Sequence, residues 1–269
     1  MMTNCFRLSA WLLASWVLLA SCAQALPIEE SYTPGQLVVA WVKPGTSVRL
    51  QDHPVAVSAQ GLVAFGFGRD AIGSQLLELE YAGQVRAFKL PIVARQYKQQ
   101  HIQGLAQKHV QPEPAVTQRI RRDANAISAV RDQINLTNAL NGEFIWPVNG
   151  RLSGVFGSRR VLNGVPKSPH KGIDIAAASG TPVMAPIAGR VALVDDGMFY
   201  TGKTVMLDHG LGVTSVYAHL QDIHVQLGQQ MAQGQVMGTV GQTGRATGPH
   251  LHFGVSWGRE ALDPALFLP

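Results

Sequence analysis

Glycine and proline divide this chain into short segments, and no other feature constrains its fold as much. The 269 residues include 28 Gly and 15 Pro, and no stretch repeats on a fixed period. Turn residues at this density favour all-β architecture and argue against solenoid and collagen-like chains. Because 46% of the residues are hydrophobic and only 14% are charged, the composition also excludes disordered and coiled-coil classes. We therefore predict a mainly β globular protein of two domains or one large one.

The N-terminal segment 1–25 has the order of features found in a secretory signal peptide. A basic residue precedes an apolar run at 11–20, and small residues follow it. This run is shorter than the ~20 residues that a retained membrane helix needs. Two processing signals overlap: a lipobox-like stretch that ends at Cys22, and an A-x-A sequence at 23–25. We predict an exported, periplasmic protein, with a lipid anchor through Cys22 as the alternative to ordinary cleavage.

The net charge bears on which partners the protein is expected to bind, and the cysteine content bears on how its fold is stabilised. Both cysteines, Cys5 and Cys22, lie in the leader, so the folded part must be stabilised by its core and not by disulfides. The formal net charge of +5 includes a basic cluster between Arg95 and Arg131. This cluster is either a solvated helix face or a surface for an anionic polymer or lipid headgroups. Since the chain is predicted to be exported, we expect no nucleic-acid partner.

The organisation along the chain is predicted from the spacing of apolar residues. Short β-rich runs between turns predict a sandwich-like N-terminal β-domain over 26–110. Apolar residues at helical spacing among polar ones predict a linker helix within 111–142. Strand-and-turn patterns then return and predict a second, antiparallel β-domain over 143–269, with a hairpin turn at 210–212.

Six of the nine histidines fall in the second predicted domain, and three of them belong to two closely spaced pairs of candidate ligands. His170 and Asp174 are four residues apart, in a context that favours a strand on which both point the same way. Alternation places His250 and His252 on one face of another strand. Imidazole and carboxylate are suitable zinc ligands, and a catalytic zinc site typically has three protein ligands and one open position. Each pair alone is a weak signal, whereas their co-occurrence is much more specific.

Three blocks together resemble the signature motifs of the lysostaphin/LytM family of zinc endopeptidases, which cut peptidoglycan peptides. The blocks are 169–175 (PHKGIDI), 216–220 (VYAHL) and 243–253 (TGRATGPHLHF). Their order and spacing match the family, and the similarity covers roughly 146–264. The resemblance implies a LytM-type antiparallel β-fold like a duplicated hybrid motif, together with one zinc ion.

The resemblance also implies a role for each matching residue. It implies that His170, Asp174 and His252 bind the zinc ion and that His219 and His250 are the catalytic pair. One of the pair would take a proton from water and the other would hydrogen-bond the oxyanion, in an order that the sequence leaves open. The chain has no H-E-x-x-H motif, so the glutamate base of that zinc-protease motif is missing.

A substrate-binding surface is expected around these groups. Thr247 and Gly248 precede the strand of His250 and are expected to form a wall for an extended peptide. Asn163, in the loop before the first ligand, is expected to line the cleft. Tyr217 alternates with His219 and is expected to share its face of the strand.

The function that the resemblance implies is hydrolysis of peptidoglycan peptide cross-links, with D-alanyl to meso-diaminopimelate as the bond expected by analogy. Stem peptides would be the partners, and a monomer is expected. The alternative is a catalytically silent relative that activates a cell-wall amidase. Because all five expected positions are retained, the sequence favours the enzyme. A zinc dipeptidase or carboxypeptidase is a third possibility, but the matching blocks lack the glutamate that its chemistry needs.

Overall fold

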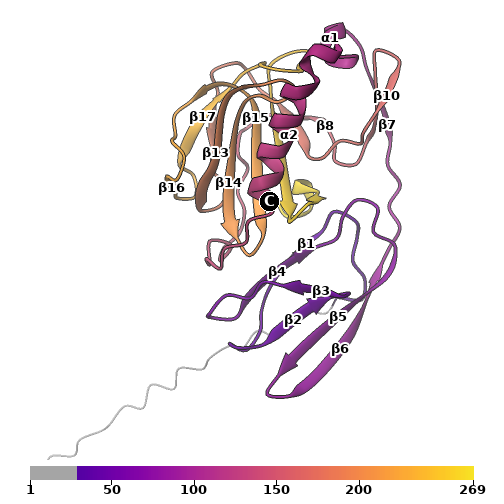
Figure 1. Ribbon diagram of the computed structural model, residues 1–269, viewed down its shortest axis with the longest axis vertical. Coiled ribbons are helices and arrows are strands. Elements are labelled where there is room, and N and C mark those ends of the chain that lie inside the picture. The colour runs from indigo at the N-terminus through magenta and orange to yellow at the C-terminus, as the bar shows by residue number, and fades with distance from the viewer. Residues whose placement is uncertain (1–28) are drawn as a thin grey trace, which may run out of the picture.

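The structure, a computed structural model, describes residues 29–269 and is mainly β, as predicted. Two β regions are joined by a segment that contains the longest helix (Figure 1). The predicted signal peptide and the lipobox with Cys22 lie outside the described residues. Within 29–269, no helix has the length and apolar character needed to cross a membrane.

The N-terminal region consists of two sheets that share one core, which confirms the sandwich-like prediction. Strand β1 pairs with β4, and a second sheet has the order β3-β2-β5-β6. Val38 and Phe65 from the first sheet pack in one cluster with Val48, Leu77 and Leu90 from the second. The strands are β1 (Leu37–Trp41), β2 (Ser47–Leu50), β3 (His53–Val55), β4 (Leu62–Gly66), β5 (Gly73–Tyr81) and β6 (Gln84–Ile92).

The C-terminal region contains a ten-stranded sheet whose two faces pack against different hydrophobic clusters. Its main path is β16-β13-β14-β15-β18-β11-β8, and the predicted hairpin at 210–212 joins β14 to β15. Val205 and Leu207 point into the main core, whereas Met206 between them packs on the opposite face. The strands are β8 (Arg151–Gly154), β11 (Ile173–Ala176), β12 (Pro182–Met184), β13 (Gly189–Met198), β14 (Gly202–Gly210), β15 (Val213–Ile223), β16 (Gln230–Met231), β17 (Val236–Val240), β18 (His250–Trp257) and β19 (Glu260–Leu262); a short helix η2 (Pro264–Leu266) follows.

The helix α2 (Thr117–Arg131) lies along the face of this sheet that is opposite the main core (Figure 1). Its Val130 packs with Met198 and Val216, and the bidentate ion pair of Arg259 with Asp132, at 2.6 and 2.7 Å, ties its C-terminal end to the sheet. The predicted helix is thereby confirmed, whereas the exact domain limits remain a prediction. Two short helices, α1 (Gln107–Val110) and η1 (Pro114–Val116), precede it.

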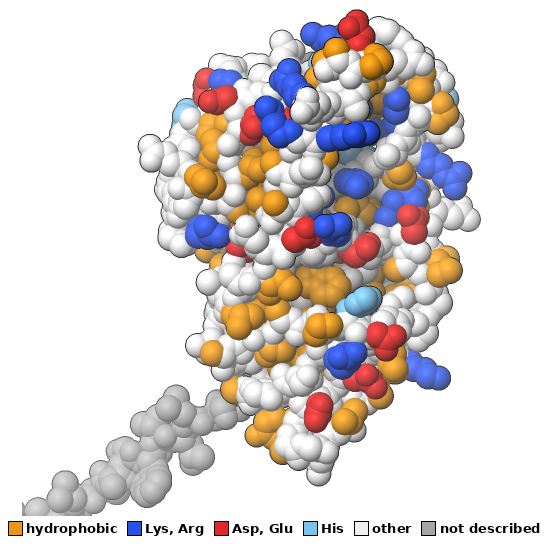
Figure 2. All heavy atoms as spheres, viewed as in Figure 1, with side chains coloured by type: hydrophobic (Ala, Val, Ile, Leu, Met, Phe, Trp, Pro, Cys, Tyr) orange, Lys and Arg blue, Asp and Glu red, His pale blue; other side chains and the backbone are white. Residues whose placement is uncertain are grey.

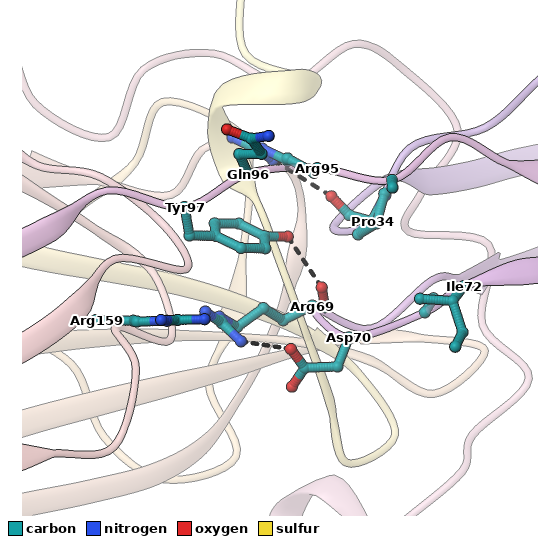
Figure 3. Close-up of a pocket in the computed structure, with 10 residues that line it drawn as sticks. Pro34, Arg69, Asp70, Ile72, Arg95, Gln96, Tyr97 and Arg159 are labelled. Atoms are coloured by element: carbon teal, nitrogen blue, oxygen red, sulfur yellow. Dashed lines mark hydrogen bonds and ion pairs between the residues drawn. The ribbon is translucent and has the colours of Figure 1, made fainter.

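A connecting segment joins the two regions through specific contacts. Tyr97 lies between Arg69 and Arg95, and its hydroxyl donates to the Arg69 carbonyl at 3.0 Å (Figure 3). Arg95 forms a 2.7 Å ion pair with Asp263, and the Arg69 guanidinium donates to the Gly157 carbonyl. The segment then continues as a strand of a three-stranded sheet, in which β7 (Gln99–Ile102) runs parallel to β9 (Arg159–Leu162), which also pairs with β10 (Val165–Lys167).

Candidate active site

The three residues expected to bind metal meet at one point on the face of the ten-stranded sheet that is opposite the main core. We call this the outer face, and the face against the main core the inner face. Asp174 of β11 and His252 of β18 are directly opposite each other in an antiparallel pair. The atoms His170 Nε2, Asp174 Oδ1 and His252 Nδ1 lie 2.9 to 3.0 Å from one another. His170 lies in the loop before β11 and not on a strand with Asp174 as the sequence predicted, yet both side chains reach the same point.

Two glycines allow the backbone to approach closely enough to build this cluster. A Cβ at Gly172, between the two ligands, would lie 2.3 Å from the Phe253 carbonyl oxygen of β18. A Cβ at Gly154 of β8 would lie 2.4 Å from Asp174 Oδ2. Both distances are far below van der Waals contact, so only glycine leaves room for β11 and its carboxylate here.

The chemistry of these donors fits a divalent metal ion. His170 Nδ1 lies 3.1 Å from the Val155 carbonyl, so this nitrogen carries the proton and Nε2 presents a lone pair to the cluster. Burial lowers the pKa of His170 to about 4, and the two histidines hold the pKa of Asp174 well below its usual range. Neutral imidazoles and an ionised carboxylate are the forms that ligate zinc. Tetrahedral ligands at about 2.0–2.1 Å would lie about 3.3 Å apart, close to the spacing found here.

Arg160 of β9 is a member of the site that the sequence did not reveal. Its guanidinium contacts Asp174 Oδ2, which leaves Oδ1 directed at the two histidines. The contact therefore orients the carboxylate, as polar groups behind metal ligands commonly do. Nothing in the sequence distinguishes Arg160 from Arg159, because the contact depends on where β9 lies relative to β11.

The two histidines expected to be catalytic lie beside the metal-binding cluster. The ring centroid of His219 is 4.7 Å from that of His250 and 6.2 Å from that of His252. His219 Nδ1 lies 2.7 Å from the Thr243 carbonyl, and His250 Nδ1 lies 2.8 Å from the Gly248 carbonyl. Each Nδ1 therefore carries a proton that it donates to the backbone, and each Nε2 is left as a proton acceptor.

His219 reaches the site because its backbone departs from strand geometry. Its φ is 65°, which is uncommon for a residue other than glycine, and its backbone N–H donates to the Thr201 carbonyl. Burial, and then the neighbouring His250 and His252, lower the pKa of His219 to about 3. The imidazole is thus neutral at neutral pH.

The expectation that Tyr217 shares a face with His219 and lines the cleft is wrong. Tyr217 is fully buried, packs against Phe253 in the main core and forms a hydrogen bond with the Ser215 hydroxyl. Strict alternation would put both side chains on one face, but the left-handed backbone at His219 breaks the alternation.

Two cavities flank the cluster. The first, the β7-side cavity of about 260 Å³, is lined by His219, His250, Thr247 and Gly248, and β7 and Leu105 contribute to its wall. The two residues expected as a peptide wall therefore lie beside the two histidines expected to be catalytic. Asn163 is not among the lining residues; its side chain holds the backbone of Leu105 through two hydrogen bonds, so it supports the wall from behind.

The second cavity, the α2-side cavity of about 560 Å³, lies between α2 and the metal-binding cluster. His170 and His252 line it, and Arg160 and Arg245 line both cavities. The five possible ligand or catalytic side chains are thus placed between two spaces that an extended substrate can occupy.

Comparison with known proteins identifies the family of this chain. A crystal structure assigned to peptidase M23 from Pseudomonas aeruginosa matches 90% of this chain and 97% of that chain, with 32% sequence identity and a TM-score of 0.68. The chain belongs to peptidase family M23. The family model, described as peptidase family M23, matches residues 168–264, which contain all three blocks identified from the sequence. The suggested lysostaphin/LytM relationship is confirmed.

Curated relatives share the M23 part of the chain. The cell division protein DipM of Caulobacter vibrioides is 34% identical over 134 residues, which are 48% of this chain and 21% of DipM. The peptidoglycan DD-endopeptidase ShyA of Vibrio cholerae is 41% identical over 112 residues, which are 40% of this chain and 26% of ShyA. The match thus spans about a quarter or less of these relatives. This M23 chain belongs to a metallopeptidase family that has peptidoglycan endopeptidases among its members.

Proposed function

We propose that this protein is a zinc-dependent endopeptidase that hydrolyses peptide cross-links of peptidoglycan, at D-alanyl to meso-diaminopimelate bonds. The observation that carries the proposal is the cluster of three ligand atoms within 3.0 Å of one another, next to two imidazoles with available Nε2 atoms. His170, Asp174 and His252 would hold the metal ion. Zinc bound there would supply Lewis acidity for a peptide carbonyl and lower the pKa of a water molecule.

Two histidines of this chain would carry out the proton transfers and stabilise the oxyanion. His219 and His250 each hold a proton on Nδ1 against a backbone carbonyl, so each Nε2 can accept a proton from water. Once protonated, the same Nε2 can donate a hydrogen bond to the oxyanion or pass the proton to the leaving amine. His250 Nε2 lies 4.0 Å from Asp174 Oδ1, which puts it at the edge of the metal-binding cluster.

The proposal is tested by digestion of purified cross-linked muropeptides with and without a chelator. We expect loss of dimeric muropeptides and gain of monomers, abolished by the chelator and restored by zinc. The mass of the products identifies the bond. If dimers persist under all conditions while the protein stimulates a cell-wall amidase, the silent-regulator function replaces the proposal.

The proposed setting is the periplasm, with stem peptides as partners. The relatives named as lipoproteins, NlpD/LppB from Pseudomonas aeruginosa and YgeR from Escherichia coli, support export and leave a lipid on Cys22 as one form of the mature protein. Mass spectrometry of the mature N-terminus tests this: a diacylglyceryl Cys22 supports the anchor, and an unmodified terminus at Leu26 supports ordinary cleavage.

A further inference from the structure

The lining of the α2-side cavity has more basic than acidic side chains. Among its described lining residues, Asp123 is the single acid. That carboxylate is already used, because it accepts from the Phe199 backbone N–H at 2.7 Å and pairs with Arg122. Figure 2 shows Lys and Arg side chains gathered around the hollow beside α2. The basic lining residues are Arg131, Arg160, Lys167, Lys171 and Arg245.

Two of these guanidinium groups have a buried Nε donor without a partner. The Nε atoms of Arg131 and Arg160 are both buried and have no hydrogen-bond partner within residues 29–269. A buried charged donor that lacks a partner is costly, and native proteins seldom leave one without a reason. Arg160 has Asp174 for part of its guanidinium, whereas no ion pair of Arg131 occurs among the described residues. The adjacent Asp132 is engaged by Arg259.

The position of Arg131 links this unpaired charge to the active site. It is the last residue of α2, and it lines the same cavity as the metal ligands His170 and His252. Arg245 has its guanidinium 4.4 Å from the Tyr200 ring centroid and lines both cavities. An anion in the α2-side cavity would therefore lie beside the metal-binding cluster. The planar fork of an arginine suits a carboxylate, which it can bind through two parallel hydrogen bonds.

We propose that the α2-side cavity binds a free carboxylate of the peptide substrate, with Arg131 as the main specificity-determining residue and Arg245 assisting. This inference rests on the proposed function and names the feature of the substrate that is recognised. In a D-alanyl to meso-diaminopimelate cross-link, the nitrogen of the cleaved amide is attached to a carbon that bears a free carboxylate. Glycine bridges carry no such group, so a cavity of this kind discriminates between the two classes of cross-link.

The test compares two substrates that differ only at this carboxylate. One is the cross-linked muropeptide dimer, and the other is the same dimer with that diaminopimelate carboxyl converted to a carboxamide. For the zinc-loaded wild-type protein we expect kcat/KM to be about 30-fold lower on the amidated dimer, as befits one charge-assisted bidentate contact. Arg131→Gln should lower kcat/KM on the free carboxylate by a similar factor and leave the amidated dimer almost unaffected. Arg131→Lys, which keeps the charge without the fork, should retain part of the preference.

The matched control is Arg121→Gln, which removes an exposed arginine of the same helix that lies outside the cavity. It should keep the full preference of the wild type. Equal cleavage of both dimers by the wild type overturns the inference and leaves the endopeptidase intact, whereas cleavage of neither dimer overturns the proposed function. A uniform loss on both dimers in Arg131→Gln would show a structural role for Arg131 and would also overturn the inference. Binding of the monomeric, diaminopimelate-containing product, measured by calorimetry, gives a second readout: its affinity should fall in Arg131→Gln and not in Arg121→Gln.

Discussion

The two faces of the catalytic sheet use the same residue types in opposite ways. On the inner face, His209 is fully buried, with Nδ1 2.7 Å from the Ala188 carbonyl and Nε2 2.7 Å from the Ser215 hydroxyl, which in turn bonds to Tyr217. Each polar side-chain atom of His209, Ser215 and Tyr217 therefore has a hydrogen-bond partner. On the outer face, His170 Nε2, Asp174 Oδ1 and His252 Nδ1 converge to within 3.0 Å of one another. A buried network in which every donor and acceptor is paired stabilises a fold, whereas a convergent set of ligand atoms is suited to binding a cation.

The strongest test of this contrast removes a ligand from the outer face. His252→Ala should abolish zinc binding and lower kcat/KM by more than about 1000-fold, because one of three protein ligands is lost. Zinc should raise the midpoint of thermal unfolding of the wild type and leave that of the variant unchanged. Metal analysis and calorimetry measure both effects. Retention of one zinc ion per chain by the variant would contradict the assigned ligand set.

The second test separates the two histidines proposed to be catalytic from the proposed ligands on the same face. His219→Ala should lower kcat by about 100- to 10,000-fold, the usual range for loss of an acid–base group, while zinc content stays at one per chain. His250→Ala should behave in the same way. Steady-state kinetics with parallel metal analysis distinguishes these variants from His252→Ala. Loss of the metal ion in either variant would place that residue among the ligands.

On the inner face, the pH dependence of stability should reveal His209. Burial lowers the pKa of His209 below its ordinary value of 6.5, so the unfolded chain takes up a proton at a pH where the folded chain does not. The free energy of unfolding therefore falls as the pH drops below 6.5, by up to about 1.4 kcal/mol per pH unit for this one proton.

The measurement is urea unfolding of chelator-treated protein between pH 7 and 5, compared with His209→Gln. The buried histidines of the outer face contribute to the slope in both proteins, so the difference between the two slopes isolates His209. We expect the slope of the variant to be smaller by up to one proton. Identical slopes would show that His209 does not titrate differently in the folded chain.

The smallest expected effect tests whether Tyr217 belongs to the core alone. Tyr217→Phe keeps the ring against Phe253 and removes the hydroxyl that bonds to Ser215. The free energy of unfolding should decrease by about 1 kcal/mol, the typical contribution of such a hydrogen bond, with kcat/KM changed less than about twofold. A tenfold loss of kcat/KM with unchanged stability would return Tyr217 to the substrate-binding surface.

The sequence was sufficient for features that depend on local periodicity and on motif spacing. The alternation in β18 correctly put His250 and His252 on one face, and the turn at 210–212 correctly predicted the β14–β15 hairpin. Helical spacing before Arg131 correctly predicted α2. These patterns are local, because the side-chain direction follows from the period of each element.

Local rules failed where the backbone departs from the regular period. His170 lies outside the strand that was expected to carry it, and the left-handed φ of His219 separates its side chain from that of Tyr217. Asn163 was expected in the cleft, but its amide is bonded to the Leu105 backbone, 58 residues earlier in the chain. Such contacts depend on the packing of distant segments and have no periodic signal.

By itself, the sequence determined the fold class and the family and predicted the five side chains that we propose carry the chemistry, because order and spacing along the chain encode these patterns directly. Only the tertiary structure decided that Arg160 contacts Asp174, that β7 and α2 contribute to different cavities beside the site, and that the Nε of Arg131 is buried without a partner in the cavity that His170 and His252 line. The physical reason is that burial and charge pairing are properties of groups brought together from distant parts of the chain, and they exist only once the elements have packed.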